Sequence, residues 1–456
     1  MQIFRKKTLE RILGESDKKT LKPTMRTIDL ILLGVGSVIG SGILVLTGEA
    51  SSKAGPSVIF SFLIAGLACG LTALCYAELS SAIPSSGSVY TYSYMTLGEI
   101  VAHSMGWLLG GSYIIAGAAI ANGWSSYFKN LLEGFGVVLP KEFTSLPSEG
   151  GYGNILAITV VLLIMLVLFK GTSSSKFVNN FMVVIKIGVI VLFVLVGIFY
   201  VKPTNWTDSF APQGLSGVMV GATTVFFAYL GFDTISTSAE ETINPQRSLP
   251  RAIIITLFIC TAFYITVCLV LTGMVPYYQL GKGDALAYVL EVVGQDRVAG
   301  IVSLGAVIGL LAGPLATMFA SIRILFTMSR DGLLPKQLMK LNKNGVPGST
   351  TIGVGIIMAL LTGFLPLEQL ADLANVSWII AFTLVSYSAI VIRKEYPNAS
   401  RGFTMPGMPY LPILSILLFL VLLYGIQLST WIIFGCWILV GLVIYFSYSM
   451  KHSIEK

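Results

Sequence analysis

A single lysine, Lys186, stands inside an otherwise apolar stretch that runs from Phe181 to Tyr200. At about 1.5 Å per residue, a helix of this length matches the hydrocarbon thickness of a bilayer. A charge at that depth is costly, so it usually faces a partner, a cavity or a transport path. Because a desolvated lysine can lose its proton, the pattern indicates a candidate proton carrier that alternates between charged and neutral forms.

A second interpretation of Lys186 is purely structural. Asn180 lies six residues before it, which is about 9 Å along a helix, and a long lysine stem can snorkel to the water interface from such a depth. The composition of the stretch leaves the proton carrier and the snorkelling lysine as near-equal alternatives.

Glycines interrupt the first apolar segment, where residues 34–42 read GVGSVIGSG. Each glycine weakens a helix by about 1 kcal/mol relative to alanine and permits backbone geometry that other residues avoid. An unwound Gly40-Ser41-Gly42 would present amide N–H groups at the start of the following half-helix, a site suited to a carboxylate. The alternative is close helix packing through small residues, which Gly36 and Gly40 fit well.

A glycine and an acid interrupt the sixth segment in the stretch 226–234, which reads FFAYLGFDT. Asp233 is costly at this depth unless it is paired or hydrated. We expect its carboxylate to cap the restarted half-helix rather than to bind substrate directly. Glycine-broken helices at corresponding positions of two halves indicate an inverted-repeat transporter with its binding site at the breaks.

The composition places the chain in a membrane. Of its 456 residues, 55% are hydrophobic and only 11% are charged, whereas a soluble protein has about 25% charged residues. The apolar runs are continuous rather than alternating, which favours membrane helices over a barrel. Basic loops then explain the net charge of +7 without a nucleic-acid partner. The five cysteines lie in apolar runs and show neither metal-ligand spacing nor a disulfide framework.

Twelve apolar segments predict an all-α polytopic membrane protein with about 12 transmembrane helices. They cover residues 28–52, 57–83, 97–128, 153–169, 178–201, 215–241, 250–275, 297–329, 350–365, 368–392, 408–427 and 429–450. With the N-terminus in the cytoplasm, 21 of the 29 lysines and arginines would lie on the cytoplasmic side and six outside, with Lys186 and Arg323 inside helices. This bias predicts that both termini are cytoplasmic. Glu78, Glu240 and Glu241 are expected to pair with basic residues of the loops or to cap helices, rather than to relay protons.

The predicted domain organisation is one transmembrane transporter domain, 28–450, between cytoplasmic tails 1–27 and 451–456. It contains a first repeat (28–201), a second repeat (215–392) and two last helices (408–450). The N-terminal tail is either a short amphipathic helix on the inner leaflet or a solvated tail that enforces orientation.

Two rival classes of protein lack support in the sequence. A channel would need a filter sequence or rings of charge, and a membrane enzyme would need a nucleophile, an acid–base pair or metal ligands. Neither pattern is visible, so we expect a transporter that is not an enzyme and needs no cofactor. Its partners would be a small-molecule substrate and the lipid bilayer, and no obligate protein partner can be read from the sequence.

Four stretches resemble the amino acid–polyamine–organocation permeases. They are 34–43 (GVGSVIGSGI), 75–94 (CYAELSSAIPSSGSVYTYSY), 226–247 (FFAYLGFDTISTSAEETINPQR) and 329–335 (SRDGLLP). Their order and spacing cover most of the first eight segments, and within the family the chain is most similar to bacterial relatives of the cationic amino acid transporters. The resemblance implies a leucine-transporter-like fold of five plus five inverted helices with two appended, in a bacterial plasma membrane.

The resemblance also implies roles for particular residues. The substrate α-carboxylate would bind at the first break and the α-amino group at carbonyls of the sixth-helix break. The candidate substrate-binding residues are Ile39, Gly40, Ser41, Gly42, Ile43, Ser112, Phe227, Ala228, Tyr229 and Gly231, with Phe227 also as a gate. Lys186 matches the fifth-helix lysine of proton-coupled relatives, so the coupling ion would be a proton rather than sodium. Its ammonium could bridge the first and eighth helices when charged.

One departure from the family pattern bears on the substrate. Cationic transporters carry a third-helix glutamate shortly after a tryptophan, and here that position falls at Ser112, after Trp107. A cationic side chain without a carboxylate partner would be poorly compensated, so we expect proton-coupled uptake (symport) of neutral L-amino acids. Gly110 and Gly111 are expected to leave extra space in the pocket. An exchanger and a cationic amino acid transporter remain the alternatives.

Overall fold

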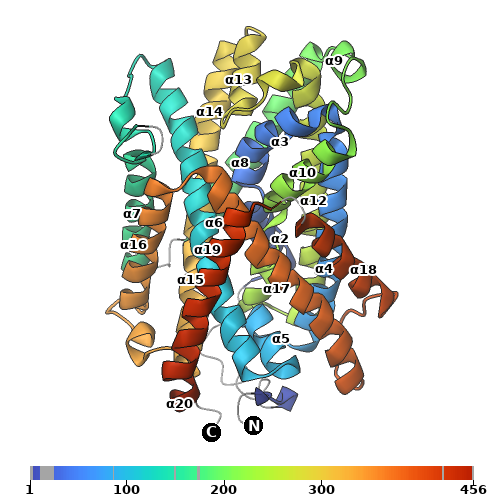
Figure 1. Cartoon of the computed structure of the whole chain (residues 1–456), viewed down its shortest axis with the longest axis vertical. Coiled ribbons are helices and arrows are strands. Elements are labelled where there is room, and N and C mark those ends of the chain that lie inside the picture. The colour runs from blue at the N-terminus through green and yellow to red at the C-terminus, as the bar shows by residue number, and fades with distance from the viewer. Residues whose placement is uncertain are drawn as a thin grey trace.

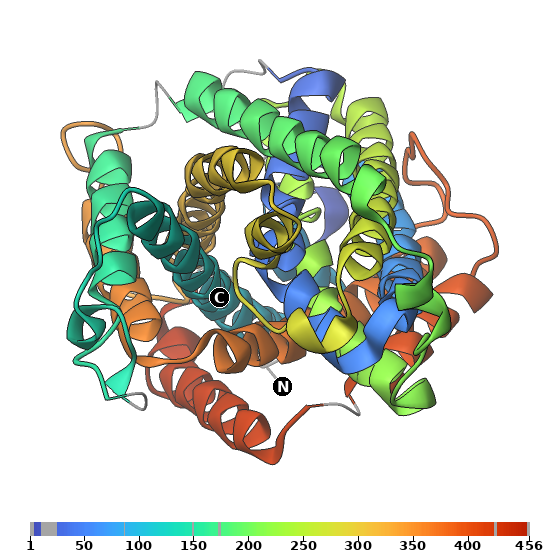
Figure 2. The same ribbon diagram turned by 90° about the horizontal axis from the view of Figure 1, so that it is seen from above.

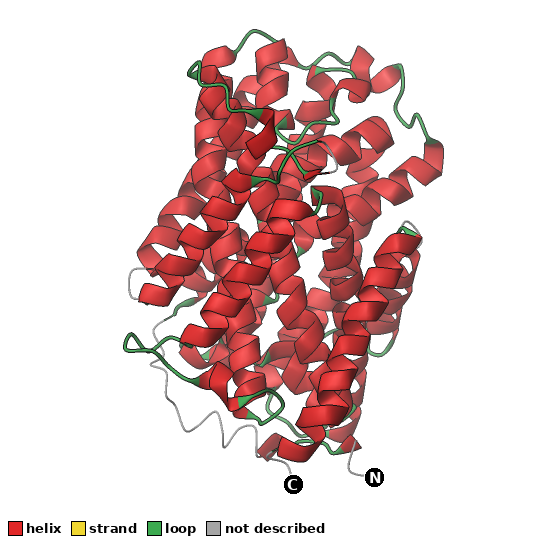
Figure 3. Cartoon of the chain, turned by 60° about the vertical axis from the view of Figure 1, so that its left-hand side comes forward, coloured by secondary structure: helices red, strands yellow, loops and turns green. Residues whose placement is uncertain are grey.

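The computed structural model of the chain is a bundle of helices (Figure 1). It describes residues 4–10, 25–85, 87–147, 150–171, 175–423 and 426–453, without the side chains of 175–180 and 240. These residues form helices, turns and loops but no strand longer than an isolated bridge (Figure 3). Most of the N-terminal tail, for which an amphipathic helix or a solvated tail was predicted, lies outside the described residues.

The bounds of the helices follow the chain in order. The first half contains α2 (Thr27–Val38), the π-helix η2 (Gly42–Leu46), α3 (Thr47–Ala54), α4 (Val58–Ala82), α5 (Ser88–Thr96), α6 (Glu99–Gly134), α7 (Ile155–Lys170) and α8 (Ser175–Gly197). The second half contains α9 (Thr204–Thr207), α10 (Gly214–Phe226), the 3-10 turn η7 (Phe227–Tyr229), α11 (Thr234–Thr237), α12 (Pro245–Met274), α13 (Ala285–Val292), α14 (Asp296–Leu310), α15 (Ala312–Arg330), α16 (Gly348–Phe364) and α17 (Leu367–Glu395). The chain ends with α18 (Tyr410–Leu422), α19 (Leu428–Ile444), the π-helix η12 (Tyr445–Ser449) and α20 (Met450–His452).

The predicted fold class is confirmed, since each of the twelve apolar segments is helical. Eight helical stretches of the described residues are long and apolar enough to cross a membrane, and four shorter apolar helices accompany them. The broken elements α2, η2 and η7 lie in the middle and are packed by α4, α8, α12, α15 and α17. Seen from above, α19 lies at the rim of the helical body (Figure 2). The centre of the bundle therefore belongs to the two interrupted segments.

The eighth apolar segment is not the single helix that was predicted. It divides into α14 and α15 at Leu311. The cause is Pro314, which has no N–H to donate to the carbonyl one turn earlier. The helices α5 and α13 were not predicted. The residues of α5 are all buried, although they lie between the second and third predicted segments.

Both described ends of the chain lie at the same end of the helical body (Figure 1). This arrangement agrees with an even number of membrane crossings, and the assignment of that end to the cytoplasm stays a prediction from the basic residues. The end opposite the termini is called the outer end.

Two of the three predicted glutamate roles can be followed. The carboxylate of Glu78 is 2% exposed and pairs with Arg393, and it lies 3.3 Å from Nε of Arg401. It also accepts from the backbone N–H of Met405 at 2.9 Å. Glu241 pairs with Arg323, which projects from α15 rather than from a loop. The side chain of Glu240 lies outside the described part.

Replacing Glu78 is expected to destabilise the protein. The change Glu78→Gln leaves two arginines without their buried counter-charge, which costs about 3 kcal/mol. The midpoint of thermal unfolding in detergent should fall clearly. The matched change Glu395→Gln removes a pair with Lys6 whose side chains are 41% and 44% exposed, and it should have little effect. Equal midpoints for the two variants would contradict this account.

Candidate substrate and proton site

The first break lies between α2 and η2. Helix α2 ends at Val38, and Ile39 is extended, with ψ of 97°. The chain resumes as η2 at Gly42 and continues directly into α3. The first N–H groups of a helix have no partner inside it, so this restart can bind an anion. The hydroxyl of Ser41 is buried and has no hydrogen-bond partner among the described residues.

The second break lies between α10 and α11. The turn η7 follows α10, Leu230 is extended, and Gly231 has a φ of +112°. A side chain at position 231 would also place its Cβ only 2.9 Å from the carbonyl oxygen of Ser37. Glycine is required here for two reasons, the positive φ and the close approach of α2.

The two breaks are in direct contact. A Cβ on Gly42 would lie 2.5 Å from the Cβ of Ala228 and would collide with the Ala228 backbone. The hydroxyl oxygens of Thr234 and Ser37 lie within hydrogen-bond distance, 3.1 Å apart. Only a residue without a side chain lets the restarted first helix approach η7 this closely.

Lys186 binds the first break and does not snorkel. Its side chain is 1% exposed, and Nζ donates to the carbonyl oxygens of Gly36 at 2.8 Å and Ile39 at 2.7 Å. These carbonyls lie where α2 ends and lack helical partners. The stem packs on α14, where a Cβ on Gly309 would come within 2.5 Å of Lys186 Cγ. The lysine therefore bonds to the first helix and makes packing contact with the eighth.

Tyr264 joins the two breaks, a role that was not predicted from the sequence. This residue of α12 is fully buried. Its hydroxyl lies 3.0 Å from the carbonyl oxygen of Val38 and 2.5 Å from that of Ala228. Because Val38 and Ile39 are neighbours, the contacts of Tyr264 and Lys186 fall on adjacent carbonyls. The signal for this contact in the sequence was a polar side chain, that of Tyr264, within the apolar stretch 250–275.

A closed cavity lies between the breaks, and we call it the central cavity. Its lining comprises Ser37, Val38, Gly40, Ser41, Gly42, Tyr113, Ala116, Ile120, Phe227, Leu230, Gly231, Thr234, Gly313, Ala316, Thr317 and Trp378. Within the described part of the chain, this lining carries no charged side chain. Its water-accessible volume is about 30 Å³, enough for very few water molecules. A substrate must therefore widen the cavity as it binds.

The structure brings half of the predicted substrate-binding residues to this cavity. Those that line it are Gly40, Ser41, Gly42, Phe227 and Gly231, whereas Ile39, Ile43, Ser112, Ala228 and Tyr229 are not in its lining. The carbonyl of Ala228 accepts from Tyr264, and the hydroxyl of Tyr229 donates to the carbonyl of Phe62 at 3.0 Å. All ten substrate-binding assignments remain predictions, as does the gating role of Phe227.

Asp233 does not cap the half-helix as predicted. Helix α11 has no side-chain cap bond from this residue. Instead, Asp233 Oδ2 accepts from the hydroxyl of Tyr113 at 2.6 Å, and Oδ1 has no partner within the described residues. Tyr113 crosses from α6 and places its hydroxyl against the carboxylate, and such charge-assisted O–H···O bonds are short and strong.

Ser112 and the glycines before it do not enlarge the cavity. The Ser112 hydroxyl donates to the Leu108 carbonyl of its own helix at 2.6 Å. A Cβ on Gly111 would lie 2.6 Å from Trp437, and one on Gly110 would lie 3.1 Å from Leu325. The expectation of extra space at these glycines was wrong, because neighbouring helices fill it.

Two aromatic residues and part of α15 complete the cavity. Trp378 is 1% exposed and meets Tyr113 edge to face at 4.9 Å between ring centroids. Gly313 and Thr317 come from the first turns of α15, after the kink. The Gly313-Pro314 pair was the signal in the sequence for this third irregular position.

A helical membrane body with two broken helices around a closed central cavity is typical of a secondary transporter. The family model described as "Amino acid permease" matches residues 25–450. The chain belongs to this family, which confirms the resemblance.

Comparison with curated proteins gives the same family. The chain is 48% identical to the methylthioribose transporter of Bacillus subtilis (strain 168), over 99% of each chain. It is 44% identical to the branched-chain amino acid permease BcaP of the same organism, over 99% of this chain and 98% of the relative. It is also 37% identical to cationic amino acid transporter 4 of Homo sapiens, over 84% of this chain and 62% of the relative. These relatives are named as transporters or permeases, not as enzymes.

Proposed function

We propose that the chain takes up neutral, apolar L-amino acids across the bacterial plasma membrane, coupled to protons, by alternating access. The observation that carries this proposal is the uncharged and mainly apolar lining of the central cavity beside two backbone breaks. The restarted helix at Gly42 supplies N–H groups for the α-carboxylate, with the unpartnered hydroxyl of Ser41 next to it. The apolar wall formed by Ala116 and Ile120 suits an aliphatic side chain.

The α-amino group needs acceptors at the sixth-helix break. The carbonyl of Gly231 already accepts from both the N–H and the hydroxyl of Thr234. The carbonyl of Phe227, which lies in the cavity lining and accepts from the N–H of Leu230, keeps a lone pair for the ligand and is the better candidate. No carboxylate lines the cavity within the described residues, which argues against lysine or arginine as the preferred substrate.

Lys186 is proposed as the proton-coupling residue. Its charged form donates to Gly36 and Ile39 and so holds α2 at the break. A charged lysine at mid-membrane depth costs about 3 kcal/mol of free energy. Loss of the proton removes this cost and weakens both hydrogen bonds to α2. The first helix could then move relative to α8 and α14.

A second candidate substrate is methylthioribose, because a relative of 48% identity bears that name. This sugar has neither an ammonium nor a carboxylate, so the polar groups at both breaks would lack their charged partners.

Uptake of labelled leucine into proteoliposomes, competed with isoleucine, valine, lysine and methylthioribose, separates the candidates. Strongest competition by methylthioribose or lysine would overturn our substrate assignment. Uptake that requires internal amino acid but no pH gradient would replace symport by exchange.

The size of the preferred side chain should depend on Gly313. A Cβ added there would lie 2.8 Å from Cγ2 of Ile120, so Gly313→Ala should narrow the cavity. We expect the KM for leucine to rise about tenfold while that for alanine changes little. Ile120→Val in the same chain should recover part of the leucine affinity. Equal losses for leucine and alanine would show that Gly313 does not contact the substrate side chain.

A further inference from the structure

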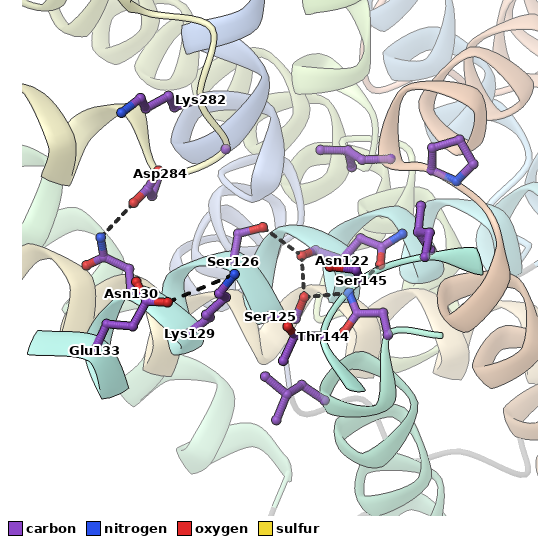
Figure 4. Close-up of a pocket in the computed structure, with 16 residues that line it drawn as sticks. Asn122, Ser125, Ser126, Lys129, Asn130, Glu133, Thr144, Ser145, Lys282 and Asp284 are labelled. Atoms are coloured by element: carbon purple, nitrogen blue, oxygen red, sulfur yellow. Dashed lines mark hydrogen bonds and ion pairs between the residues drawn. The ribbon is translucent and has the colours of Figure 1, made fainter. Parts of the chain in front are cut away.

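We propose that a second cavity, at the outer end, is a binding site for zwitterionic amino acids that fills before the central cavity. This inference rests on the proposed amino acid transport. The cavity, called the outer hollow, has a volume of about 490 Å³, within the range of small-molecule sites. It is bounded by α6, the loop before α7, residues 282–284 and the start of α17. Figure 4 shows its lining.

Asp284 provides an acceptor for the ligand ammonium. Its Oδ2 accepts a hydrogen bond of 2.8 Å from Nδ2 of Asn130, which is a neutral donor. The two side chains point toward each other in Figure 4. The ammonium of nearby Lys282 lies over the ring of Tyr288, 3.5 Å from its centroid. Burial raises the pKa of the Asp284 carboxyl, although the charge of Lys282 and the hydrogen bond from Asn130 act in the opposite direction. A ligand ammonium would donate a charge-assisted hydrogen bond to this carboxylate.

Lys129 provides a cation for the ligand carboxylate. Its Nζ lies 3.9 Å from the carboxylate of Glu133, too far for a hydrogen bond. Both residues lie on the last turns of α6 with 35% and 45% of their side chains exposed. Lys282 and Glu133 also line the outer hollow, so its charged side chains among the described residues are two lysines and two carboxylates. This balance matches a zwitterion rather than a plain cation or anion.

The opposite wall of the outer hollow is rigid and polar. Asn154 Nδ2 donates to Asn122 Oδ1 at 3.0 Å and to Ser125 Oγ at 2.7 Å. Asn122 in turn donates to the carbonyl of Leu365 at 3.0 Å. These bonds join α6, the start of α7 and the segment before α17, so the hollow is a preformed space.

A thin layer separates the outer hollow from the central cavity. Val45 is 1% exposed. A Cβ on Gly283, in the lining of the outer hollow, would lie 3.7 Å from Val45 Cγ1. A Cβ on Gly123 would lie 2.7 Å from Val45 Cγ2 and 3.4 Å from Cβ of Ser41, which lines the central cavity. Val45 therefore packs against residues of both spaces and lies on the path between them.

The test compares transport from the two faces in the full-length permease. Asp284→Asn should raise the KM for leucine about tenfold at the outer face, with the maximal rate unchanged. The KM at the other face, measured in vesicles of opposite orientation, should not change. The matched variant Asp296→Asn alters an exposed carboxylate at the same end and outside the hollow, and it should behave as the wild type.

Equilibrium binding of labelled leucine gives a second readout. The wild type should bind two molecules per chain, and Asp284→Asn and Asn130→Ala should each bind one. A single wild-type site, or equal KM changes at both faces, would overturn the outer site while leaving amino acid transport intact. A wild type that neither binds nor transports leucine would overturn the proposed function, and this inference with it.

Discussion

Replacing Lys186 by alanine is expected to abolish proton-driven accumulation while leaving substrate binding measurable. One pH unit can drive about tenfold accumulation at one proton per substrate, since 1.4 kcal/mol corresponds to a factor of ten. In Lys186→Ala the inside and outside concentrations of leucine should only equalise. The physical reason is that the side chain is the buried cation whose two bonds hold the end of α2. Uptake into proteoliposomes with and without an imposed gradient measures the effect.

The control for Lys186 is a lysine that lies just after the same helix. Lys202 is exposed at the outer end, and Lys202→Ala should accumulate leucine as the wild type does. Binding of leucine to Lys186→Ala, followed by a thermal shift, shows whether the cavity has survived. Normal accumulation by that variant would remove Lys186 from the coupling mechanism. If Lys186→Ala lost both leucine binding and leucine accumulation, the result would assign Lys186 a structural role only.

Adding one methyl group at Gly42 should be the second severe change. In Gly42→Ala the new Cβ would overlap the backbone of Ala228, so the two breaks would be forced apart. Misplacement of binding groups by about 1 Å can cost about 100-fold in rate, and we expect a loss of transport of that order. Initial rates of leucine uptake, normalised to folded protein by size-exclusion chromatography, give the measurement.

Gly40 offers a matched comparison only two residues away. A Cβ at Gly40 meets nothing within 4 Å, and this residue lies in the same break. Gly40→Ala should therefore lose far less activity than Gly42→Ala, although its methyl group enters the cavity. Equal losses would mean that backbone freedom of the break, rather than the contact with Ala228, limits transport.

The arrangement of Lys186 and Tyr264 explains why the effects of Lys186→Ala and Gly42→Ala should be linked. Lys186 holds the carbonyl of Ile39, and Tyr264 contacts the carbonyls of Val38 and Ala228. These contacts link the first break to the sixth-helix break through neighbouring peptide groups. Alternating access needs a small set of such two-state contacts rather than a continuous deformation.

The class of the protein and its interrupted helices could be predicted from the sequence. Long apolar runs leave no alternative to membrane helices, because unsatisfied backbone groups are too costly in lipid. The glycines of the first and sixth segments break those helices because glycine lowers helix stability and permits positive φ. The lone cation in the fifth segment could be recognised because a charge inside lipid is costly.

The tertiary structure alone decided what these groups touch. Sequence spacing could not choose between a snorkelling Lys186 and one bound to α2, since both fit the same helix. It also could not show that Trp437 fills the space beside Gly111, that Tyr113 rather than a backbone N–H binds Asp233, or that Tyr264 spans both breaks. Each of these contacts joins residues far apart along the chain. Local propensity carries no information about such partners, because packing between helices selects them.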